Sequence, residues 1–367
     1  MQILTDKESL MPVLSRVAGV VERRQTLPVL GNLLVTATDQ LVEIVGTDLE
    51  VEIRSRVPAR VQSPGEITVP AKKLVDIWRA LPEGIEVSFK VEKDRALIRA
   101  GRSRFALSTL PARDFPLMEG GAGEVRIELG QRQLKSVLDR TAFAMAHQDV
   151  RYYLNGLLLE VHPDRIVAVA TDGHRLAKVE ADARVDIEEV RQAILPRKTV
   201  IELARLLAGS ESAVQIDLSE KGFRAVVDDT VLTSKLVDGR YPDYGRVIPL
   251  RSEKVAEVSR EGLRQALLRT SILSNEKYRG VRLEFEPGNL RVQANNPEQD
   301  EAEEELEIGY ASEPTGLGFN VAYLLDVLNV LGTEEVHLAF SDGNSSTVLS
   351  GGGSGEREVF VVMPLRL

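Results

Sequence analysis

The chain has 367 residues, more than one hydrophobic core normally organises, so two or three domains are expected. Its composition, 43% hydrophobic and 28% charged, is typical of a globular protein and excludes a disordered or fibrous chain. The absence of cysteine excludes disulfides, thiolate metal sites and a cysteine nucleophile. The first ten residues carry no apolar signal segment, and no stretch reaches about 18 uninterrupted apolar residues, so a cytoplasmic protein is expected.

Apolar residues at helical spacing mark the beginning of three similar segments. Leu10, Leu14, Val17 and Val21 form the first stripe, and stripes of the same period recur at 134–141 and 263–270. Thr5 and Glu8 have the spacing of a capping box ahead of the first helix, and Pro12 is expected to delay or kink that helix. A second helical pattern recurs at 69–78, 195–204 and 319–328.

The runs between these helices show that the chain repeats itself. Asp48, Asp172 and Asn296 occupy equivalent places in the similar segments 41–53, 165–177 and 290–302, and both intervals are 124 residues. The neighbouring runs alternate apolar and polar residues, which is typical of half-buried antiparallel strands. The order in each repeat is therefore helix, strands, helix, strands.

Breaks in the pattern place the boundaries between the repeats. Pro116 with the glycines at 120, 121 and 123 marks one boundary, and the segment 249–254 marks the other. We therefore predict an α+β fold of three repeated domains, at 1–121, 125–249 and 253–367.

The expected helices differ in charge from the rest of the chain. The whole chain has 46 basic and 56 acidic residues, a net charge of −10. The six helical segments hold 16 basic and 8 acidic residues, a net of +8, which leaves −18 for everything else. Helices often expose Lys and Arg for solubility alone, but this concentration favours a polyanionic partner. Scattered cations without a base-reading motif predict non-specific, salt-sensitive contact with nucleic acid.

Several segments, spread over all three repeats, have a recognisable sequence: RRQTLPVLGNLL (23–34), AHQDVRYYLNG (146–156), ATDGHRLAKVE (170–180), LPRKTVIELARLL (195–207), DGRYPDYGRVIP (238–249), SILSNEKYRGVRL (271–283), FNVAYLLDVLNVL (319–331) and VVMPLRL (361–367). Together they closely resemble the bacterial sliding clamp family, the beta subunit of DNA polymerase III. The resemblance implies a non-enzymatic processivity factor that encircles duplex DNA. The implied partners are double-stranded DNA, a second copy of the chain, the replicative polymerase catalytic subunit, the clamp loader and other replication and repair proteins. No cofactor and no membrane partner are implied.

The resemblance also implies a clamp-type fold, with helices on one face and antiparallel sheets on the other, and a head-to-tail homodimer. Twelve helices, each about 10 Å wide, would line a circle of centres roughly 38 Å across and leave an opening of about 28 Å. A duplex of roughly 20 Å passes through such an opening. Topology then holds the ring on DNA, and an acidic exterior is compatible with that function.

Three sets of site residues are implied by matching the family's motifs. For contact with DNA they are Arg24, Gln148, Tyr152, Tyr153, Arg197 and Lys198; packing at the entry to a strand is an equal alternative for the two tyrosines on composition alone. For a hydrophobic cleft that takes partner peptides between the second and third domains they are Leu154, Thr171, Gly173, His174, Arg175, Leu176, Pro242, Arg246, Val247, Asn320, Tyr323, Ser346, Val361, Met363, Pro364, Leu365 and Arg366. For the subunit contact they are Phe105 and Leu107 against Ile272 and Leu273, which could instead be ordinary core residues. Asn344 and Leu365 depart from the aliphatic residue and the methionine often found at these positions, which bears on the peptide preference.

Other chemistries receive less support. Thr171 to Arg175 places Asp172 near His174, but no serine elbow accompanies them, and the four histidines lack metal-ligand spacing. The acidic run Asp300, Glu301, Glu303, Glu304, Glu305 and Glu307 could hold Mg²⁺ in a carboxylate-metal nuclease or phosphatase, although a solvated strand is favoured. Gly351, Gly352, Gly353 and Gly355 lack the Lys of a phosphate loop and indicate a hairpin tip. A repeat scaffold that binds peptides and no nucleic acid is the third alternative. We expect neither catalytic residues nor a metal site.

Overall fold

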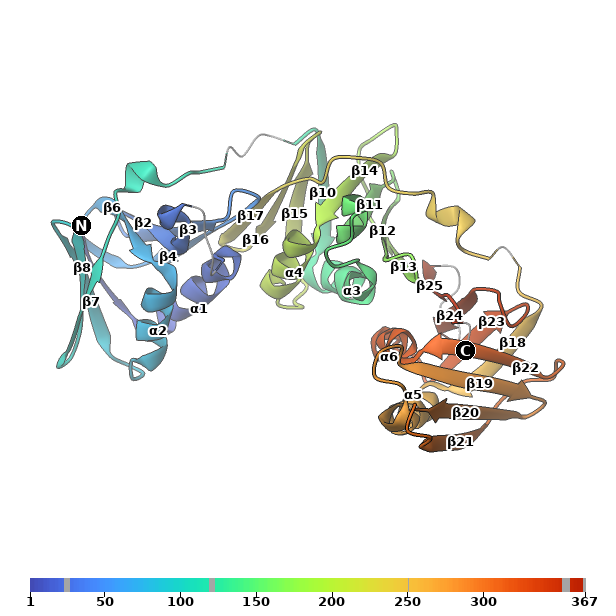
Figure 1. Ribbon diagram of the computed structural model, residues 1–367. Coiled ribbons are helices and arrows are strands. Elements are labelled where there is room, and N and C mark those ends of the chain that lie inside the picture. The colour runs from blue at the N-terminus through green and yellow to red at the C-terminus, as the bar shows by residue number, and fades with distance from the viewer. Residues whose placement is uncertain (23–26, 119–122, 250, 352–356, 366–367) are drawn as a thin grey trace. The chain divides into compact units, whose positions relative to one another are not determined.

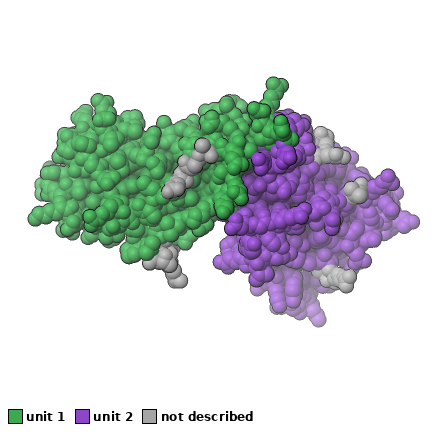
Figure 2. All heavy atoms as spheres, turned by 90° about the horizontal axis from the view of Figure 1, so that it is seen from above, with its two compact units in different colours: residues 1–135, 183–188, 198–236 green, residues 136–182, 189–197, 237–367 purple. Residues whose placement is uncertain are grey.

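The computed structural model describes residues 1–22, 27–118, 123–249, 251–351 and 357–365. Arg24, Arg366 and the glycines at 352, 353 and 355 lie outside these residues. The chain divides into two compact units, which Figure 2 colours green and purple. Unit 1 comprises residues 1–135, 183–188 and 198–236, and unit 2 comprises residues 136–182, 189–197 and 237–367. Within the described ranges, no helix has the length and apolar character needed to cross a membrane.

In the part of the chain that the structure describes, six α-helices lie where the apolar stripes predicted them (Figure 1). They are α1 (Lys7–Val17), α2 (Ala71–Ala80), α3 (Gln131–Thr141), α4 (Arg197–Leu206), α5 (Arg260–Thr270) and α6 (Val321–Val330). In α1 the stripe residues Leu10, Leu14 and Val17 are buried, while in α2 the basic residues Lys72 and Lys73 are exposed. Each helix thus turns one apolar face to a core, as its 3.6-residue period requires.

Unit 1 contains two antiparallel sheets. The first has the order β5 (Arg60–Ser63), β1 (Gln2–Asp6), β7 (Glu86–Glu92), β8 (Arg95–Ala100) and β9 (Ser103–Ser108). The second has the order β10 (Val125–Gly130), β15 (Ala213–Leu218), β16 (Gly222–Val227), β17 (Thr230–Lys235), β4 (Val51–Pro58), β3 (Leu41–Thr47), β2 (Asn32–Thr38) and β6 (Gly65–Pro70). In the second sheet β17 pairs with β4, with Leu232 opposite Ile53, so one sheet joins strands of the first and second repeats.

Unit 2 is built in the same way. Its larger sheet has the order β14 (Arg191–Pro196), β11 (Gly156–Val161), β12 (Arg165–Thr171), β13 (Arg175–Asp182), β25 (Glu358–Val362), β24 (Thr347–Gly351), β23 (Glu335–Phe340) and β18 (Lys254–Ser259). Its smaller sheet has the order β21 (Glu301–Glu307), β20 (Asn289–Asn295), β19 (Gly280–Glu286) and β22 (Thr315–Asn320). The pairing of β13 with β25 joins the second and third repeats. Because each of the two large sheets contains strands of two repeats, the boundary between the compact units passes through the second repeat.

The internal repeat is visible in the turns that follow equivalent strands. Oδ1 of Asp48 accepts hydrogen bonds from the backbone N–H groups of Glu50 and Val51, at 2.9 and 2.7 Å. Oδ1 of Asp172 accepts from His174 and Arg175 in the same way, at 2.9 and 3.0 Å. A short polar side chain that bonds the backbone two and three residues later stabilises a tight turn. The equivalence predicted from the sequence spacing is therefore a structural one for the first two repeats.

The start of α1 differs from the sequence prediction. Asp6 caps the helix, because its Oδ1 accepts a 2.7 Å hydrogen bond from the N–H of Ser9, so the Thr5–Glu8 capping box was wrong. Thr5 belongs to β1 instead, and Glu8 accepts from the N–H of Gly84 at 2.7 Å. Pro12 lies inside α1 and does not delay it, since the helix already begins at Lys7.

Candidate functional site

The clearest polar cluster in unit 2 surrounds the guanidinium of Arg175, which is 12% exposed. Its Nε lies 3.2 Å from Oδ2 of Asp172, its Nη1 pairs with Oδ2 of Asp326, and its Nη2 donates to the carbonyl of Phe143 at 2.8 Å. Its Cζ also lies 4.6 Å from the ring centroid of Tyr323, within the range of a cation–π contact. The three bonds and the ring contact fix this side chain from several sides.

Tyr323 and His174 form a wall beside Arg175. Their ring centroids are 6.2 Å apart and their planes differ by 20°. Burial, followed by the nearby charge of Asp172, raises the pKa of Tyr323, so its hydroxyl stays protonated at neutral pH. The structure therefore brings three of the predicted cleft residues into direct association.

In the same turn, the carboxylate of Asp172 is bonded to backbone N–H groups through Oδ1 and to Arg175 through Oδ2. Thr171 Oγ1 donates to the carbonyl of Arg175 at 2.7 Å and accepts from the N–H of Gly173 at 3.1 Å. Gly173 has φ +88°, a left-handed conformation that suits glycine. Asp172, Thr171 and Gly173 therefore shape the turn that presents His174.

An apolar cluster lies beneath this turn. Leu154, Leu176 and Val361 are 2%, 1% and 1% exposed and belong to one core cluster in unit 2. Leu176 on β13 lies opposite Val361 on β25 in the sheet. These three predicted cleft residues therefore lie in the core of unit 2 and expose almost no surface.

The end of the chain runs alongside these residues. The N–H of Met363 donates to the carbonyl of His174 at 2.8 Å, and the N–H of Leu365 donates to the carbonyl of Gly318 at 2.7 Å. The hydroxyl of Ser346 lies 3.0 Å from Sδ of Met363. Met363, Pro364 and Leu365 are all partly exposed. The described end of the chain is thus fastened next to the His174 turn.

The segment that follows β17 carries the remaining rim residues. Pro242, Arg246 and Val247 are exposed. Tyr241, 6% exposed, accepts a 3.0 Å hydrogen bond at its hydroxyl from the N–H of Thr171, and Tyr244 donates to Oε2 of Glu160 at 2.8 Å. Burial raises the pKa of both tyrosines, and for Tyr244 the bond to Glu160 adds to the increase.

Two asparagines in the predicted cleft region have local roles. Asn320 caps α6 through Oδ1, which accepts from the N–H of Ala322 at 3.0 Å. Asn344, one of the departures from the family pattern, is exposed in a turn where its N–H donates to Asp342. Tyr241, Tyr244, Phe143 and Asp326 were not among the predicted site residues. The two tyrosines stand out in DGRYPDYGRVIP as aromatic residues shortly before the predicted domain boundary at 249–254, but no local pattern marks the other two.

The predicted DNA contacts are found in both units. In unit 2, Gln148 has φ +57°, Tyr152 is 56% exposed, and Tyr153 packs against the apolar cluster. Tyr152 and Tyr153 belong to the short 3₁₀ helix η5 (Tyr152–Asn155), and their centroids are 5.8 Å apart. Within this loop, Nε and Nη2 of Arg151 donate hydrogen bonds to the two carboxylate oxygens of Asp149, at 3.0 and 2.8 Å, and these bonds lower the pKa of Asp149 to about 2. Tyr152 is thus free to meet a partner, whereas Tyr153 is half committed to the core.

The two predicted basic contacts at the start of α4 are already bonded within the chain. Nη1 of Arg197 donates to the carbonyl of Met145 at 3.1 Å. In unit 1, Nζ of Lys198 donates to the carbonyl of Val20 at 2.8 Å, to Glu22 at 3.0 Å and to Oδ2 of Asp48. Two carboxylates therefore neutralise the ammonium group of Lys198.

The predicted subunit contact involves two different kinds of surface. Phe105 is partly buried and Leu107 is 8% exposed on β9, an edge strand of its sheet. Ile272 is 76% exposed and Leu273 is partly buried on the 3₁₀ helix η7 (Ser271–Leu273). Only Ile272 of the four is a large apolar side chain left open to solvent.

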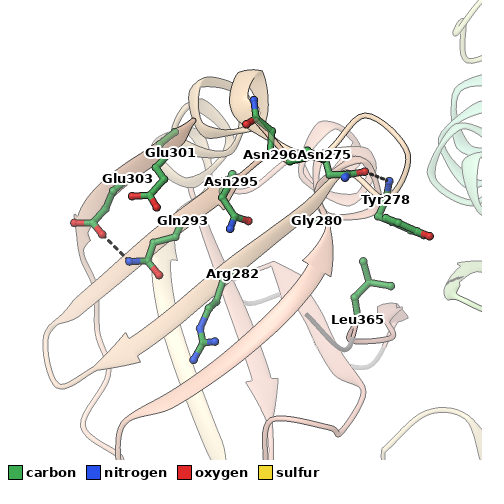
Figure 3. A pocket seen from close by; sticks show the side chains of 13 residues that line it. Asn275, Tyr278, Gly280, Arg282, Gln293, Asn295, Asn296, Glu301, Glu303 and Leu365 are labelled. Atoms are coloured by element: carbon green, nitrogen blue, oxygen red, sulfur yellow. Dashed lines mark hydrogen bonds between the residues drawn. The ribbon is translucent and has the colours of Figure 1, made fainter. Parts of the chain in front are cut away.

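A pocket of about 1010 Å³ lies on the third repeat (Figure 3). Its lining combines polar and apolar surface and comes mainly from the loop with Asn275 and Tyr278 and from β19, β20 and β21. Among the described residues, Leu365 is the one that this pocket shares with the predicted cleft. Within it Gln293 bonds Glu303 at 2.6 Å. Among the residues that the structure describes, no group of three His, Cys, Asp or Glu side chains is arranged to hold a metal ion.

Comparison with known proteins gives matches along the whole chain. Three family models match in order: the DNA polymerase III beta subunit N-terminal domain at residues 1–119, its central domain at 128–243 and its C-terminal domain at 245–366. The Beta sliding clamp of Pseudomonas putida is 51% identical over 368 residues, covering 100% of both chains. A crystal structure of a DnaN sliding clamp from Pseudomonas aeruginosa bound to griselimycin is 50% identical, with a TM-score of 0.96 and full coverage of both chains. The sliding clamp of Caulobacter crescentus is 37% identical, with a TM-score of 0.92 and the same coverage.

Proposed function

The chain belongs to the DNA polymerase III beta subunit family, the bacterial sliding clamps, and from this premise we propose how its residues perform the work of a clamp. It is a DNA sliding clamp, an accessory subunit that keeps the replicative polymerase on its template. The observation that carries this conclusion is the full-length match to clamps, repeated in all three parts of the chain. We place its work in the cytoplasm, where a bacterial chromosome is replicated.

We propose that two copies close head to tail into a ring. Two sheet edges support this arrangement. β9 is an edge strand that carries exposed Arg104 and follows exposed Arg102, and β21 is an edge strand with exposed Glu301 and Glu305. Unpaired strand edges of opposite charge are suited to pair with each other. Pairing β9 of one copy with β21 of the other would bring Phe105 and Leu107 near Ile272 and Leu273, and a contact between unlike surfaces repeats head to tail.

The inner face of the ring is proposed to meet duplex DNA through its basic helices. The predicted contacts Arg24, Gln148, Tyr152, Tyr153, Arg197 and Lys198 remain proposals, and the exposure of Tyr152 supports its place among them. The net charge of +8 over the helical segments supports a mildly attractive lining.

Partner peptides are proposed to dock against the wall of His174, Arg175 and Tyr323 and the end of the chain at Met363 to Leu365. The griselimycin complex of the P. aeruginosa clamp supports this proposal, since griselimycin is a peptide. The polymerase catalytic subunit, the clamp loader and repair proteins would compete for the same site. Proposed boundaries of the three domains stay at 1–121, 125–249 and 253–367.

We further propose that the chain has no active site of its own. The carboxylate-metal nuclease finds no support among the relatives. The acidic run from Glu301 to Glu307 forms β21, where Glu303 accepts a hydrogen bond from Gln293 and Glu304 accepts one from Arg269, at 2.6 and 2.8 Å. Incubation with DNA and Mg²⁺ should leave the DNA intact. Cleavage that disappears in Glu303→Gln and Glu305→Gln would overturn this proposal.

Loading onto circular and linear DNA tests the central function. With a bacterial clamp loader and ATP, the chain should remain on a nicked circle during gel filtration and leave the same DNA once it is linearised. Retention that is equal on both forms would show ordinary binding and contradict a sliding ring. A failure to associate with either form, with an active loader, would favour a peptide scaffold that binds no nucleic acid.

A further inference from the structure

Arg175 has few hydrogen-bonding groups left for a ligand. Asp172, Asp326 and the carbonyl of Phe143 engage its Nε, Nη1 and Nη2, and the side chain is 12% exposed. Its guanidinium instead offers a flat surface, which lies 4.6 Å from the centroid of Tyr323 and 5.3 Å from that of Phe143. Arg175 therefore supports the aromatic wall more than it reads a ligand.

Asp326 is the member of this cluster that comes from the third repeat. It lies one turn after Tyr323 on α6, and its side chain is 40% exposed. The other two partners, Asp172 and Phe143, come from the second repeat. The pair of Asp326 and Arg175 thus connects two segments that are 151 residues apart in the chain.

The equivalent junction of the first two repeats lacks this pair. Val51 stands at the position of Arg175, three residues after the turn aspartate. Glu202 stands on α4 where Asp326 stands on α6, but it pairs with Arg205 of its own helix at 2.6 Å. The pair is therefore no general requirement of the repeated fold.

We propose that Asp326 is a positioning residue for the peptide site: it holds Arg175 against Tyr323, and so fixes the wall of Tyr323 and His174 before a peptide arrives. This proposal rests on the proposed peptide-binding function. Met363 extends the effect to the end of the chain, because its N–H bonds the carbonyl of His174. The ligand class is a linear or cyclic peptide with apolar anchor side chains, which pack on a preformed wall without a cost of ordering it.

Binding kinetics of griselimycin on the full-length dimer separate this role from a direct contact. In Asp326→Asn the arrangement of Tyr323 and His174 that binds a peptide is populated for less of the time. The association rate should therefore fall about fivefold while the dissociation rate stays unchanged. Asp326→Glu, which keeps the carboxylate, should recover most of the loss. Glu286→Gln, the same charge change at an exposed position of unit 2, is the matched control and should bind like the wild type.

Three outcomes would overturn the proposal. Unchanged kinetics in Asp326→Asn would show that the pair is idle, and a higher dissociation rate alone would make Asp326 a direct ligand contact. A melting temperature that falls together with affinity in both Asp326→Asn and Asp326→Glu would show that the pair of Asp326 and Arg175 stabilises the fold and does not position the peptide site. Failure of the wild type to bind griselimycin would contradict the proposed peptide site itself. This result is distinguishable from the others because it is seen before any residue is substituted.

As a second measurement, the ¹⁹F resonance of 3-fluorotyrosine at position 323 should broaden in Asp326→Asn and remain sharp in Asp326→Glu, without any ligand.

Discussion

The hydroxyl of Tyr244 donates a 2.8 Å hydrogen bond to Oε2 of Glu160, a residue that is only 7% exposed on β11. The other carboxylate oxygen accepts a 2.6 Å bond from Nε2 of Gln192. Tyr244 opens the short 3₁₀ helix η6 (Tyr244–Arg246), which is followed directly by Val247. The bond therefore fixes the place of two proposed rim residues through a carboxylate in the sheet.

Tyr244→Phe should weaken both stability and peptide binding. The substitution keeps the ring but leaves one oxygen of a buried carboxylate without its partner, at a cost of about 1–3 kcal/mol. We expect a lower urea midpoint and a severalfold weaker affinity for griselimycin. Tyr278→Phe, at an exposed tyrosine, is the control for stability and should leave the urea midpoint unchanged. Wild-type values for both quantities in Tyr244→Phe would show that the connection is held by other contacts.

Ile272→Asp should separate the two copies. Ile272 is 76% exposed in the single chain, and a charge placed there would be desolvated if the proposed contact forms. Analytical ultracentrifugation should show a dissociation constant raised by at least about tenfold, since burying an unpaired carboxylate costs more than the roughly 1.4 kcal/mol that a tenfold change represents. Val255→Asp, at an apolar position of β18 that is 50% exposed, should remain dimeric. If Ile272→Asp sediments as the wild type does, η7 lies outside the subunit contact.

Local periodicity explains how much of the fold was predictable. All six helices and the antiparallel pairing followed from 3.6-residue and alternating patterns, which depend on neighbours in the chain. The cap of α1 was missed because Thr5 and Asp6 are both competent caps, and the backbone path decided between them. The joining of β17 to β4 was also missed, because strand neighbours distant in sequence leave no periodic signal.

The residues of the candidate site also divide into those that the sequence could predict and those that it could not. Motif resemblance named His174, Arg175 and Tyr323, and the structure places them together. Asp326, Phe143 and Glu160 could not be named, because each acts through a partner far away in the chain. A carboxylate on a helix or strand has no sequence feature that distinguishes such an inward pairing from simple solvation.

Lys198→Met should destabilise the chain, because the ammonium group of Lys198 bonds Val20, Glu22 and Asp48 within unit 1. The lysine is 27% exposed and its partner Asp48 is 8% exposed, so the change leaves a largely buried carboxylate with backbone partners alone. We expect a loss of about 1–3 kcal/mol, seen as a lower urea midpoint. Lys73→Met, at an exposed lysine of α2, should leave the midpoint unchanged. If Lys198→Met keeps wild-type stability but slips from circular DNA faster, the lysine serves as a DNA contact instead.

Acid should release the loop that carries Gln148 and Tyr152. The bonds from Arg151 lower the pKa of Asp149 from 3.8 to about 2, so the folded chain binds this proton less readily than the unfolded chain. A depressed pKa contributes stability that is complete above the unfolded value and lost as the pH falls from about 4 towards 2. The difference in urea midpoint between the wild type and Asp149→Asn should thus be constant from pH 7 to pH 5 and narrow below pH 4. A difference that stays constant down to pH 3 would contradict the proposed cause.

Deletion of Met363 to Leu367 should abolish peptide binding and leave the dimer intact. The deletion removes the bonds from Met363 to His174 and from Leu365 to Gly318, together with Pro364. It stops short of β25, which ends at Val362, so the large sheet of unit 2 keeps all its strands. Neither β9 nor η7 contacts the deleted segment through any of these bonds.

Griselimycin affinity should fall by at least about a hundredfold, because the deletion removes the residues that form one side of the proposed peptide site. Sedimentation should still report dimers at the wild-type concentration. Monomers after the deletion would mean that the end of the chain takes part in the subunit contact, and peptide binding that survives it would place the peptide site elsewhere in the chain.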